Sequence, residues 1–404
     1  DTIITNIEKV IRDTISSGGT GSCDEAFYVV DIEDIVRKHM KWLLNIPRVQ
    51  PYYAVKCNPS PIVLELLAGL GVGFDCASKS EMDLVLDLGI PANRIIYANP
   101  CKSGSFIRHA RDIGVNIMTF DNELELHKIR QYHPDATLVI RIRVDDRHSR
   151  WPLGTKFGAH KSEVRKLLQT VIRLNLQVIG VSFHVGSGCQ SAQAYHQAIA
   201  DAKWVFEVGR ELGFIMKFLD IGGGFPGAVS ANQATFEVMA QAVNSALELH
   251  FPAIDSNGNK SDISIISELG RYYVGSAFTL ATNIIAKRCV QWDSPTGSPE
   301  MMYYLNDGIY GSFLSSKIDG VIFNPIPLST DTNDRPLYTS TLWGPTCDSI
   351  DCIIKGVVLP ELNIGEWVHF NDMGAYTTSS STQFNGFPRP GLVYHVSAPM
   401  RQML

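Results

Sequence analysis

Four residues with chemically useful side chains stand where apolar, strand-like runs of this sequence end. Lys56 closes PYYAVK, His184 follows VIGVSF, and Glu268 and Arg271 close SIISELGR. A lysine at the end of an apolar strand is poorly solvated, so its pKa falls and the neutral amine can attack a carbonyl to form a Schiff base. For a lysine considered alone, an ammonium that simply reaches the surface would be the better explanation.

Two glycine-containing turns follow other apolar runs. Residues 220–227 read DIGGGFPG, and GSG at 186–188 comes soon after His184. Three glycines expose backbone N–H groups that can bind phosphate, and Arg271 could complete such a site. The turn matches neither the GxGxxG of a dinucleotide fold nor the GK[ST] of a P-loop. Gly-rich turns between strand and helix are also common structural features, and Glu268 with Arg271 could be a salt-bridged strand end.

Taken together, these residues predict a single site. A lysine for a Schiff base, a flat histidine, a phosphate-binding turn with an arginine, and Glu268 beside a cationic ring nitrogen are the parts of a pyridoxal 5′-phosphate (PLP) site. Asp75 in GFDC and Arg141 in TLVIR lie at the ends of two further runs and join the candidate set. We expect no metal, because no pair of Cys or His residues has the spacing of a ligand motif.

The elements that must position these residues follow a regular pattern. From about residue 27 to about residue 274, short apolar runs alternate with helical patterns, beginning with AFYVVD and ending with SIISELG. Apolar strands separated by helices predict a parallel sheet buried on both faces. About eight such units over some 250 residues favour a (β/α)₈ barrel, in which reactive side chains sit at the C-terminal strand ends. An open, doubly wound sheet is the alternative.

The remaining sequence predicts a second domain. FTLATNIIAKRCVQW, MMYYLNDG, STLWG, CIIKGVVL and EWVHFND are typical of β-strands. We therefore expect residues 1–30 to pack with a β domain, residues 31–272 to form the barrel, and residues 273–404 to form an antiparallel β-sandwich or barrel. Residues 293–299 and 329–335 are predicted loops, because they are rich in Ser, Thr, Asp, Asn and Pro.

The composition limits the classes of function. Among 404 residues, 45% are hydrophobic, 35 are Lys or Arg and 41 are Asp or Glu, so the formal net charge is −6. This balance disfavours nucleic acid and favours neutral or cationic partners. Eight cysteines without a CxxC pair indicate free thiols in a reducing, cytoplasmic compartment. No apolar run approaches the ~20 residues that span a bilayer, and the N-terminus lacks a signal-like pattern, so we expect no membrane contact.

Eight motifs, in order along nearly the whole chain, resemble those of the eukaryotic-type ornithine decarboxylase family, PLP enzymes of the alanine-racemase-like class. They are PYYAVKCNP, GFDCAS, IIYANPCK, SFHVGSGC, LDIGGGFPG, NDGIYGSF, WGPTCDSID and MGAYT. The resemblance implies PLP-dependent decarboxylation of L-ornithine to putrescine, a step of polyamine biosynthesis. It also implies an obligate homodimer whose active sites are shared between subunits.

The resemblance assigns roles to the matching residues. Lys56 would carry the Schiff base, Glu268 would pair with the ring nitrogen, and Cys347 would help to protonate the product. His184 would stack on the ring, with Asp75 and Arg141 near the Schiff base. Further cofactor contacts would come from Ser187, Gly223, Gly224, Gly270, Arg271 and Tyr376. Substrate contacts would come from Tyr310, Asp319, Asp348 and Phe384, and dimer contacts from Lys156, Asp351 and Gly374. Cys347, Asp348 and Tyr310 would reach in from the partner subunit.

Two alternatives to ornithine decarboxylation stay open at this point. Asp319 and Asp348 suit the distal ammonium of a diamino acid, but ornithine and lysine differ by one methylene, worth only ~1–3 kcal/mol, so lysine or another amino acid could be the substrate. The second alternative is a regulatory, antizyme-inhibitor-like relative. Arg108 and Arg111 lie in a segment that resembles the family's antizyme-binding region, although exposed arginines on a helix are usually a solvated face.

Glu268 and its neighbour bear on the reaction type. The racemase branch of this fold is expected to have arginine at this position, so Glu268 favours decarboxylation over racemisation. The family usually has proline after this glutamate, whereas this chain has Leu269. Proline would stiffen the backbone. We therefore expect leucine to hold the Glu268 carboxylate less firmly in its orientation. Catalytic efficiency should fall modestly, without a change in reaction class.

Overall fold

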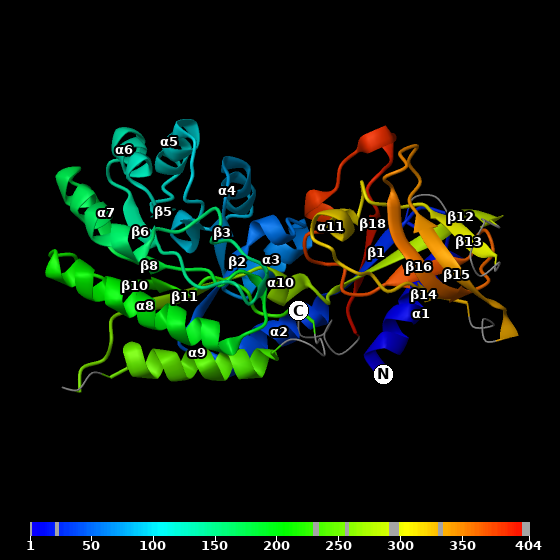
Figure 1. Ribbon diagram of the computed structural model, residues 1–404, viewed down its shortest axis with the longest axis horizontal. Helices are drawn as coiled ribbons and strands as arrows, with labels where there is room; N and C mark the ends of the chain where they lie inside the picture. Colours follow the sequence, from blue (N-terminus) through cyan, green and yellow to red (C-terminus); the bar gives the residue numbers. More distant parts are fainter. Residues whose placement is uncertain are drawn as a thin grey trace. The chain divides into compact units, whose positions relative to one another are not determined.

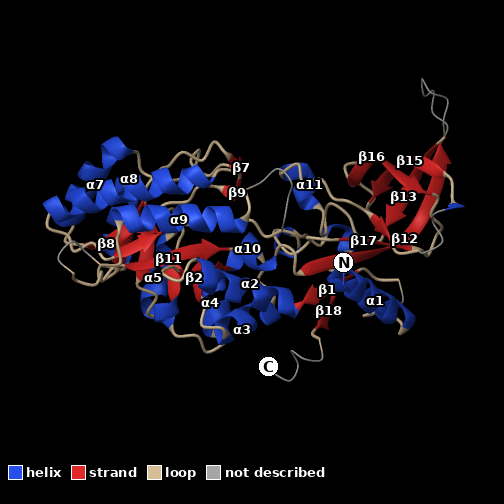
Figure 2. Cartoon of the chain, turned by 90° about the horizontal axis from the view of Figure 1, so that it is seen from below, coloured by secondary structure: helices blue, strands red, loops and turns tan. Residues whose placement is uncertain are grey.

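The computed structural model describes residues 2–20, 24–228, 234–254, 258–290, 299–329 and 334–397. The chain divides into two compact units. One is Lys38–Tyr272, and the other combines Asp1–Arg37 with Tyr273–Leu404 (Figure 1). The first unit is built of helices around parallel strands, whereas strands dominate the second (Figure 2).

Eight parallel strands close the first unit into a barrel, which confirms the predicted fold class and excludes the open sheet. Their order is β10-β11-β2-β3-β4-β5-β6-β8. The strands are β2 (Gln50–Ala54), β3 (Gly73–Cys76), β4 (Ile95–Tyr97), β5 (Ile117–Phe120), β6 (Thr137–Arg141), β8 (Gln177–Ser182), β10 (Phe218–Asp220) and β11 (Ser264–Leu269). Most of their residues are buried, as expected for parallel strands covered on both faces.

Helices follow the barrel strands and surround them (Figure 1). They are α2 (Ile32–Asn45), α3 (Pro61–Gly69), α4 (Lys79–Leu86), α5 (Gly104–Asp112), α6 (Glu123–Tyr132), α7 (Lys161–Arg173), α8 (Ala192–Glu211), α9 (Phe236–His250) and the short α10 (Arg271–Val274). Several begin at a side chain that accepts a backbone N–H, and Asn122 does so for α6 with the N–H of Glu125 at 3.0 Å. A short antiparallel ribbon pairs β7 (Ser149–Trp151) with β9 (Ser187–Cys189).

The barrel interior contains side chains that contact one another across the strands. One cluster of buried residues comprises Tyr52, Ile96, Ala98, Val139, Phe218 and Ile266. Small residues make room for it: a Cβ at Gly73 would come within 2.5 Å of the Tyr52 ring, and a Cβ at Gly180 would collide with the backbone carbonyl of Phe218. These glycines therefore allow close packing in the barrel wall.

The second unit contains an eight-stranded sheet. Its strands are β1 (Phe27–Asp31), β12 (Phe278–Val290), β13 (Glu300–Leu305), β14 (Ile326–Pro327), β15 (Leu337–Trp343), β16 (Cys352–Pro360), β17 (Trp367–Phe370) and β18 (Gly391–His395). Most pairs are antiparallel, whereas β13–β15 and β1–β18 are parallel. Helix α1 (Thr2–Ser16) packs on this sheet, with Ile11 in the same buried cluster as Phe27 and Trp367.

One predicted strand lies in the other unit. AFYVVD, included among the strand-like runs of the barrel region, forms β1, which pairs with β12 and β18 of the β sheet. A fully buried apolar strand has the same sequence pattern in either setting, so the pattern could not assign its partners. Helix α6 is capped by Asn122, whereas the preceding residue Asp121 accepts the N–H of Gly158 at 2.9 Å.

Some predictions fall outside the described residues. These are most of the loop 293–299, the middle of the loop 329–335, and Cys23. The seven other cysteines, all described, are free thiols. Within the described part of the chain, no helix has the length and apolar character needed to cross a membrane.

Replacing Gly180 by Ala is expected to lower the free energy of unfolding by about 1–3 kcal/mol, because the new Cβ would push strand β8 away from β10. Equilibrium urea denaturation measures the change. Gly69→Ala is the matched control, since nothing lies within 4 Å of its added Cβ, and it should be neutral or stabilising by up to about 1 kcal/mol. Equal stability of the two variants would contradict this view of the barrel wall.

Candidate active site

Three of the predicted site residues lie in, or directly after, three neighbouring strands of the barrel, β11, β2 and β3. Asp75 lies in β3, opposite Ala54 of β2, and Glu268 lies in β11, opposite Tyr52 of β2. Lys56 comes directly after β2, in the 3-10 turn η1 (Val55–Cys57). Its Nζ contacts the Asp75 carboxylate, and the two form an ion pair in which Asp75 is fully buried and the lysine side chain is 43% exposed.

Glu268 is a buried carboxyl whose pKa is set by opposing effects of burial and neighbouring charges. Burial, and then the negative charge of Asp75, raise its pKa to about 7, while the positive charges of Lys56 and Arg141 act in the opposite direction. A carboxyl with a pKa near 7 can exchange a proton with a bound group under physiological conditions. A cation next to it would favour its ionised form.

His184 is a half-buried, neutral imidazole. Its pKa lies well below the usual value, first because of burial and then because of the positive charges of Arg141 and Lys56. The backbone N–H of Gly186 donates to Nδ1 at 2.9 Å, so the proton of the neutral ring is on Nε2. Arg141 is held nearby at the end of β6, with its guanidinium 5.0 Å from the centre of the Phe157 ring.

The glycine turn after β10 forms a cradle of backbone groups. Gly222 and Gly224 have φ values of 65° and 108°, which residues other than glycine rarely adopt. A Cβ at Gly224 would also lie 2.6 Å from the Gly186 carbonyl oxygen and 3.0 Å from Tyr195 Oη. Tyr195 Oη donates to the Gly223 carbonyl at 3.0 Å, which ties the turn to helix α8.

Two residues predicted to contact the phosphate lie before and after the glycine turn in the sequence. Ser187 is the first residue of β9, and Arg271 is the first residue of α10, with its guanidinium 4.6 Å from the centre of the Trp151 ring. Gly270 lets the chain pass close to β2, since a Cβ there would come within 3.0 Å of Cys57 Cβ. Leu269 is buried and continues β11 opposite Tyr53, so strand pairing holds the backbone next to Glu268.

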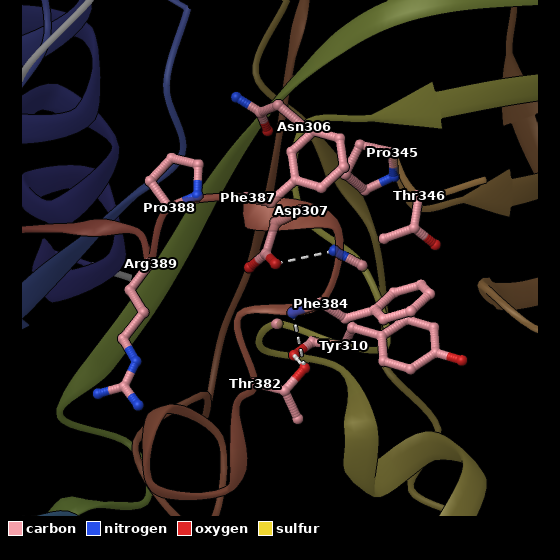
Figure 3. Close-up of a pocket in the computed structure, with 12 residues that line it drawn as sticks. Asn306, Asp307, Tyr310, Pro345, Thr346, Thr382, Phe384, Phe387, Pro388 and Arg389 are labelled. Carbon is pink, nitrogen blue, oxygen red and sulfur yellow. Dashed lines mark hydrogen bonds between the residues drawn. The ribbon is translucent and has the colours of Figure 1, made fainter. Parts of the chain in front are cut away.

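A second group of predicted residues comes together in the β unit. The Tyr310 hydroxyl donates to Asp348, and the rings of Tyr310 and Phe384 lie with centroids 4.4 Å apart beside a small pocket (Figure 3). The hydrogen bond from Tyr310 is the main reason why the pKa of Asp348 lies below its usual value. Cys347 is an exposed thiol whose backbone N–H donates to Asn385 Oδ1 at 3.2 Å.

Other predicted residues of the β unit have local roles in the fold. Asp351 is buried and accepts hydrogen bonds from the Ile309 N–H at 2.8 Å and from Thr346 Oγ1 at 2.6 Å. A Cβ at Gly374 would collide with the Val274 carbonyl oxygen, which explains the glycine without a partner subunit. Asp319 follows the short helix α11 (Leu314–Ile318) as its C-cap.

Two more predicted residues have distinctive local conformations. Tyr376, in the β unit, has a φ of 58° and accepts a hydrogen bond from Ser380 Oγ at its carbonyl. Lys156, in the barrel unit, is exposed and lies with Nζ 5.0 Å from the centre of the Phe157 ring. Their predicted roles in phosphate binding and in the dimer interface stay predictions.

The structure adds residues that the sequence argument did not select. Asp220 ends strand β10 as a fully buried carboxyl, and Glu81 at the start of α4 interacts electrostatically with Asp75 and Lys56. Trp151 lies under the guanidinium of Arg271. Asp220 closes the apolar run KFLD, so the strand-end rule that selects Lys56 applies to it as well.

Comparison with known proteins identifies the family. Residues 32–275 match the model of the pyridoxal binding domain of the pyridoxal-dependent decarboxylases. The chain belongs to this family. It is 50% identical over 375 residues to antizyme inhibitor 2 of Xenopus laevis, covering 92% of this chain and 81% of that protein. It is 46% identical over 405 residues to ornithine decarboxylase of Rattus norvegicus, covering 98% of this chain and 86% of that protein.

A solved structure extends the family relation to the fold. The arginine decarboxylase of Paramecium bursaria Chlorella virus matches with a TM-score of 0.88 at 35% identity, covering 96% of this chain and 100% of that one. PLP is therefore the cofactor, and the residues present fit it. Asp75 Oδ1 is buried without a hydrogen-bond partner among the described residues, and the cradle at Gly224 leaves no room for a Cβ, so only glycine keeps its backbone groups accessible to a phosphate.

Gly224→Ala is expected to weaken PLP binding by at least ~10-fold, because a left-handed residue with a Cβ costs about 1–2 kcal/mol and the side chain would also crowd the cradle. Fluorescence titration of the apo protein with PLP measures the affinity. Gly213→Ala is the matched control, since Gly213 has a φ of 90° but nothing lies within 4 Å of its added Cβ. Equal PLP affinities of the two variants would contradict a cofactor role for the turn.

Proposed function

We propose that this chain is a cytoplasmic ornithine decarboxylase that uses PLP to convert L-ornithine into putrescine for polyamine biosynthesis. The observation that carries the proposal is the contact of the Lys56 amine with buried Asp75 at the barrel mouth, with the Glu268 carboxyl on the adjacent strand. This arrangement supplies an amine for covalent attachment and an acid for a ring nitrogen. The 46% identity to the rat ornithine decarboxylase supports the substrate assignment.

In this proposal the barrel unit holds the cofactor. Lys56 would bind PLP covalently, and the glycine turn at Gly223 and Gly224, with Ser187 and Arg271, would hold the phosphate, to which Tyr376 of the β unit would add a contact. When bound, PLP supplies an electron sink for the negative charge that loss of CO₂ leaves on the substrate.

In this proposal, the side chains around the pyridine ring of PLP adjust the charge on that ring. Glu268 holds a proton on the ring nitrogen, which strengthens the sink, and its near-neutral pKa suits this exchange. Neutral His184 offers a flat face to the ring without adding a positive charge. Asp75 and Arg141 lie near the Lys56 amine in this proposal. Asp75 orients that amine through its ion pair with Lys56 Nζ.

The β unit contributes the substrate-binding residues. The hydrogen bond from Tyr310 lowers the pKa of Asp348 further below neutrality, and the ionised Asp348, together with Asp319, can receive the distal ammonium of ornithine. The Phe384 ring, beside Tyr310, gives the methylenes an apolar surface. The Cys347 thiol delivers a proton to the substrate carbon that has lost CO₂.

We propose further that the chain acts as a homodimer. Tyr310, Cys347 and Asp348 of one copy then complete the barrel site of the other, and Lys156, Asp351 and Gly374 belong to the interface. Asp351 would act there through the loops that it holds in place, because its carboxylate is buried within its own unit.

A second candidate function is regulatory. The 50% identity to antizyme inhibitor 2 of Xenopus laevis favours a role in binding antizyme. Arg108 and Arg111 are exposed on helix α5 and offer a basic surface for such a partner. A protein with this role alone would release no CO₂ from any amino acid. Incubation of the PLP-loaded protein with L-ornithine, L-lysine and L-arginine, with product identification, separates the two functions and identifies the substrate.

Lys56→Ala is expected to abolish CO₂ release from ornithine and to remove the visible absorbance of the PLP-loaded protein, since no other residue would hold the cofactor covalently. Absorption spectroscopy and a CO₂-release assay measure the two effects. Lys79→Ala, which removes a lysine at the start of helix α4, is the control and should behave as the wild type. Retained absorbance in the Lys56 variant would refute its role.

Asp348→Ala is expected to lower kcat/KM for ornithine by roughly 100-fold, through loss of a charge-assisted contact with the ammonium. Steady-state kinetics measure the change, and Asp334→Ala removes a carboxylate elsewhere in the β unit as the control. Unchanged kinetics in the Asp348 variant would refute its role.

The same variants test the shared site. Random association of the Lys56→Ala and Asp348→Ala chains leaves about a quarter of the sites intact in a two-fold dimer with shared sites. Their mixture is therefore expected to recover about that share of wild-type activity, whereas sites contained within one copy would recover none.

A further inference from the structure

Asp220 is a buried carboxyl that the proposed mechanism does not use. It is the last residue of strand β10, which pairs with β11 in the barrel. Its Oδ1 accepts the N–H of Gly222 at 2.8 Å, whereas its Oδ2 is buried without a hydrogen-bond partner among the described residues. A buried carboxyl oxygen without a donor is costly, so its presence calls for a physical explanation.

The group next to Asp220 is Glu268. Gly222 links the two residues, because its N–H donates to Asp220 while its carbonyl accepts the backbone N–H of Glu268 at 2.9 Å. The two side chains lie close enough to share a hydrogen bond and to affect each other's ionisation. As two carboxylates they have no proton to share, and both oxygens would only accept.

The surrounding charges do not neutralise both acids. The Lys56 ammonium contacts Asp75, and the Arg141 guanidinium lies over the Phe157 ring. His184 is neutral, and the Tyr52 phenol, whose pKa is raised by burial and then by Asp220, bears no positive charge. Two adjacent buried carboxyls in such a setting cannot both ionise without a large electrostatic cost.

We propose that Asp220 is a positioning residue that keeps a proton at neutral pH and donates it in a hydrogen bond to Glu268, so that the pair carries one negative charge. The negative charge is on Glu268, and the hydrogen bond from Asp220 orients the Glu268 carboxylate toward its target. The inference rests on the proposed function for the identity of that target, the protonated ring nitrogen of PLP.

The acidities of the two groups agree with this arrangement. Burial, followed by the negative charge of Glu268, raises the pKa of Asp220 well above its usual value. The pKa of Glu268 is raised only to about 7, because Lys56 and Arg141 oppose the effect of burial. The proton therefore resides on Asp220 and the charge on Glu268.

The first test detects the proton directly in the full-length apo protein. Infrared spectroscopy at pH 7.5 is expected to show the C=O band of a protonated carboxyl in the wild type, and Asp220→Asn is expected to remove most of its intensity, leaving the part contributed by partly protonated Glu268. Asp262→Asn, which removes an exposed carboxylate near the other end of strand β11, is expected to leave the band unchanged. Absence of the band in the wild type, or an undiminished band in Asp220→Asn, overturns the proposal.

The second test separates donation of a hydrogen bond from simple packing. An asparagine side chain can donate to Glu268 in place of a protonated aspartic acid, whereas alanine cannot. Asp220→Ala is therefore expected to weaken PLP binding by roughly 10–100-fold, and Asp220→Asn to stay within about 3-fold of the wild type. Fluorescence titration measures the affinity, and circular dichroism verifies folding. Equal losses in both variants overturn the proposal.

These results are independent of the catalytic assignment. The infrared band and the PLP affinity are measured without an amino-acid substrate, so a wild-type protein that passes both tests but releases no CO₂ would refute only the proposed decarboxylation. Conversely, an active decarboxylase without the protonated carboxyl would refute only the role of Asp220.

Discussion

The burial of acidic side chains around a single lysine is the constraint on which the barrel mouth depends. Asp75, Asp220 and Glu268 are buried at strand ends, whereas Lys56 remains partly exposed. Carboxylates removed from water are costly unless a cation or a proton accompanies them. A cofactor with a cationic ring nitrogen relieves part of this cost, which links electrostatics within the fold to cofactor binding.

In the β unit, a buried carboxylate holds loops that carry predicted functional residues in one conformation. Asp351 is buried beneath its loops and accepts hydrogen bonds from two segments, around Ile309 and Thr346. The next segment carries Asp348, which Tyr310 binds through its hydroxyl. A buried carboxylate thus orders the loop, and the partly exposed carboxylate of Asp348 on that loop stays accessible to a ligand.

Membership of the family does not by itself assign the activity. Relatives at similar identity include both ornithine decarboxylases and antizyme inhibitors, so the same fold has at least two functions. The difference must therefore lie in individual side chains. In this chain an amine at Lys56, a buried acid at Glu268 and an ionised carboxylate at Asp348 are all present, and this combination favours catalysis.

The sequence by itself was sufficient to predict the barrel, because apolar runs separated by helices leave few other ways to bury both faces of a parallel sheet. The rule that reactive groups follow barrel strands also found Lys56, Asp75 and Glu268. The pairing of β1 with the β sheet and the hydrogen bonds of Asp351 were decided only by the tertiary structure. So was the partnership of Asp220 with Glu268. Whether a carboxyl keeps its proton depends on its burial and on its distance from other charges across neighbouring strands, and neither quantity is contained in the order of residues along one strand.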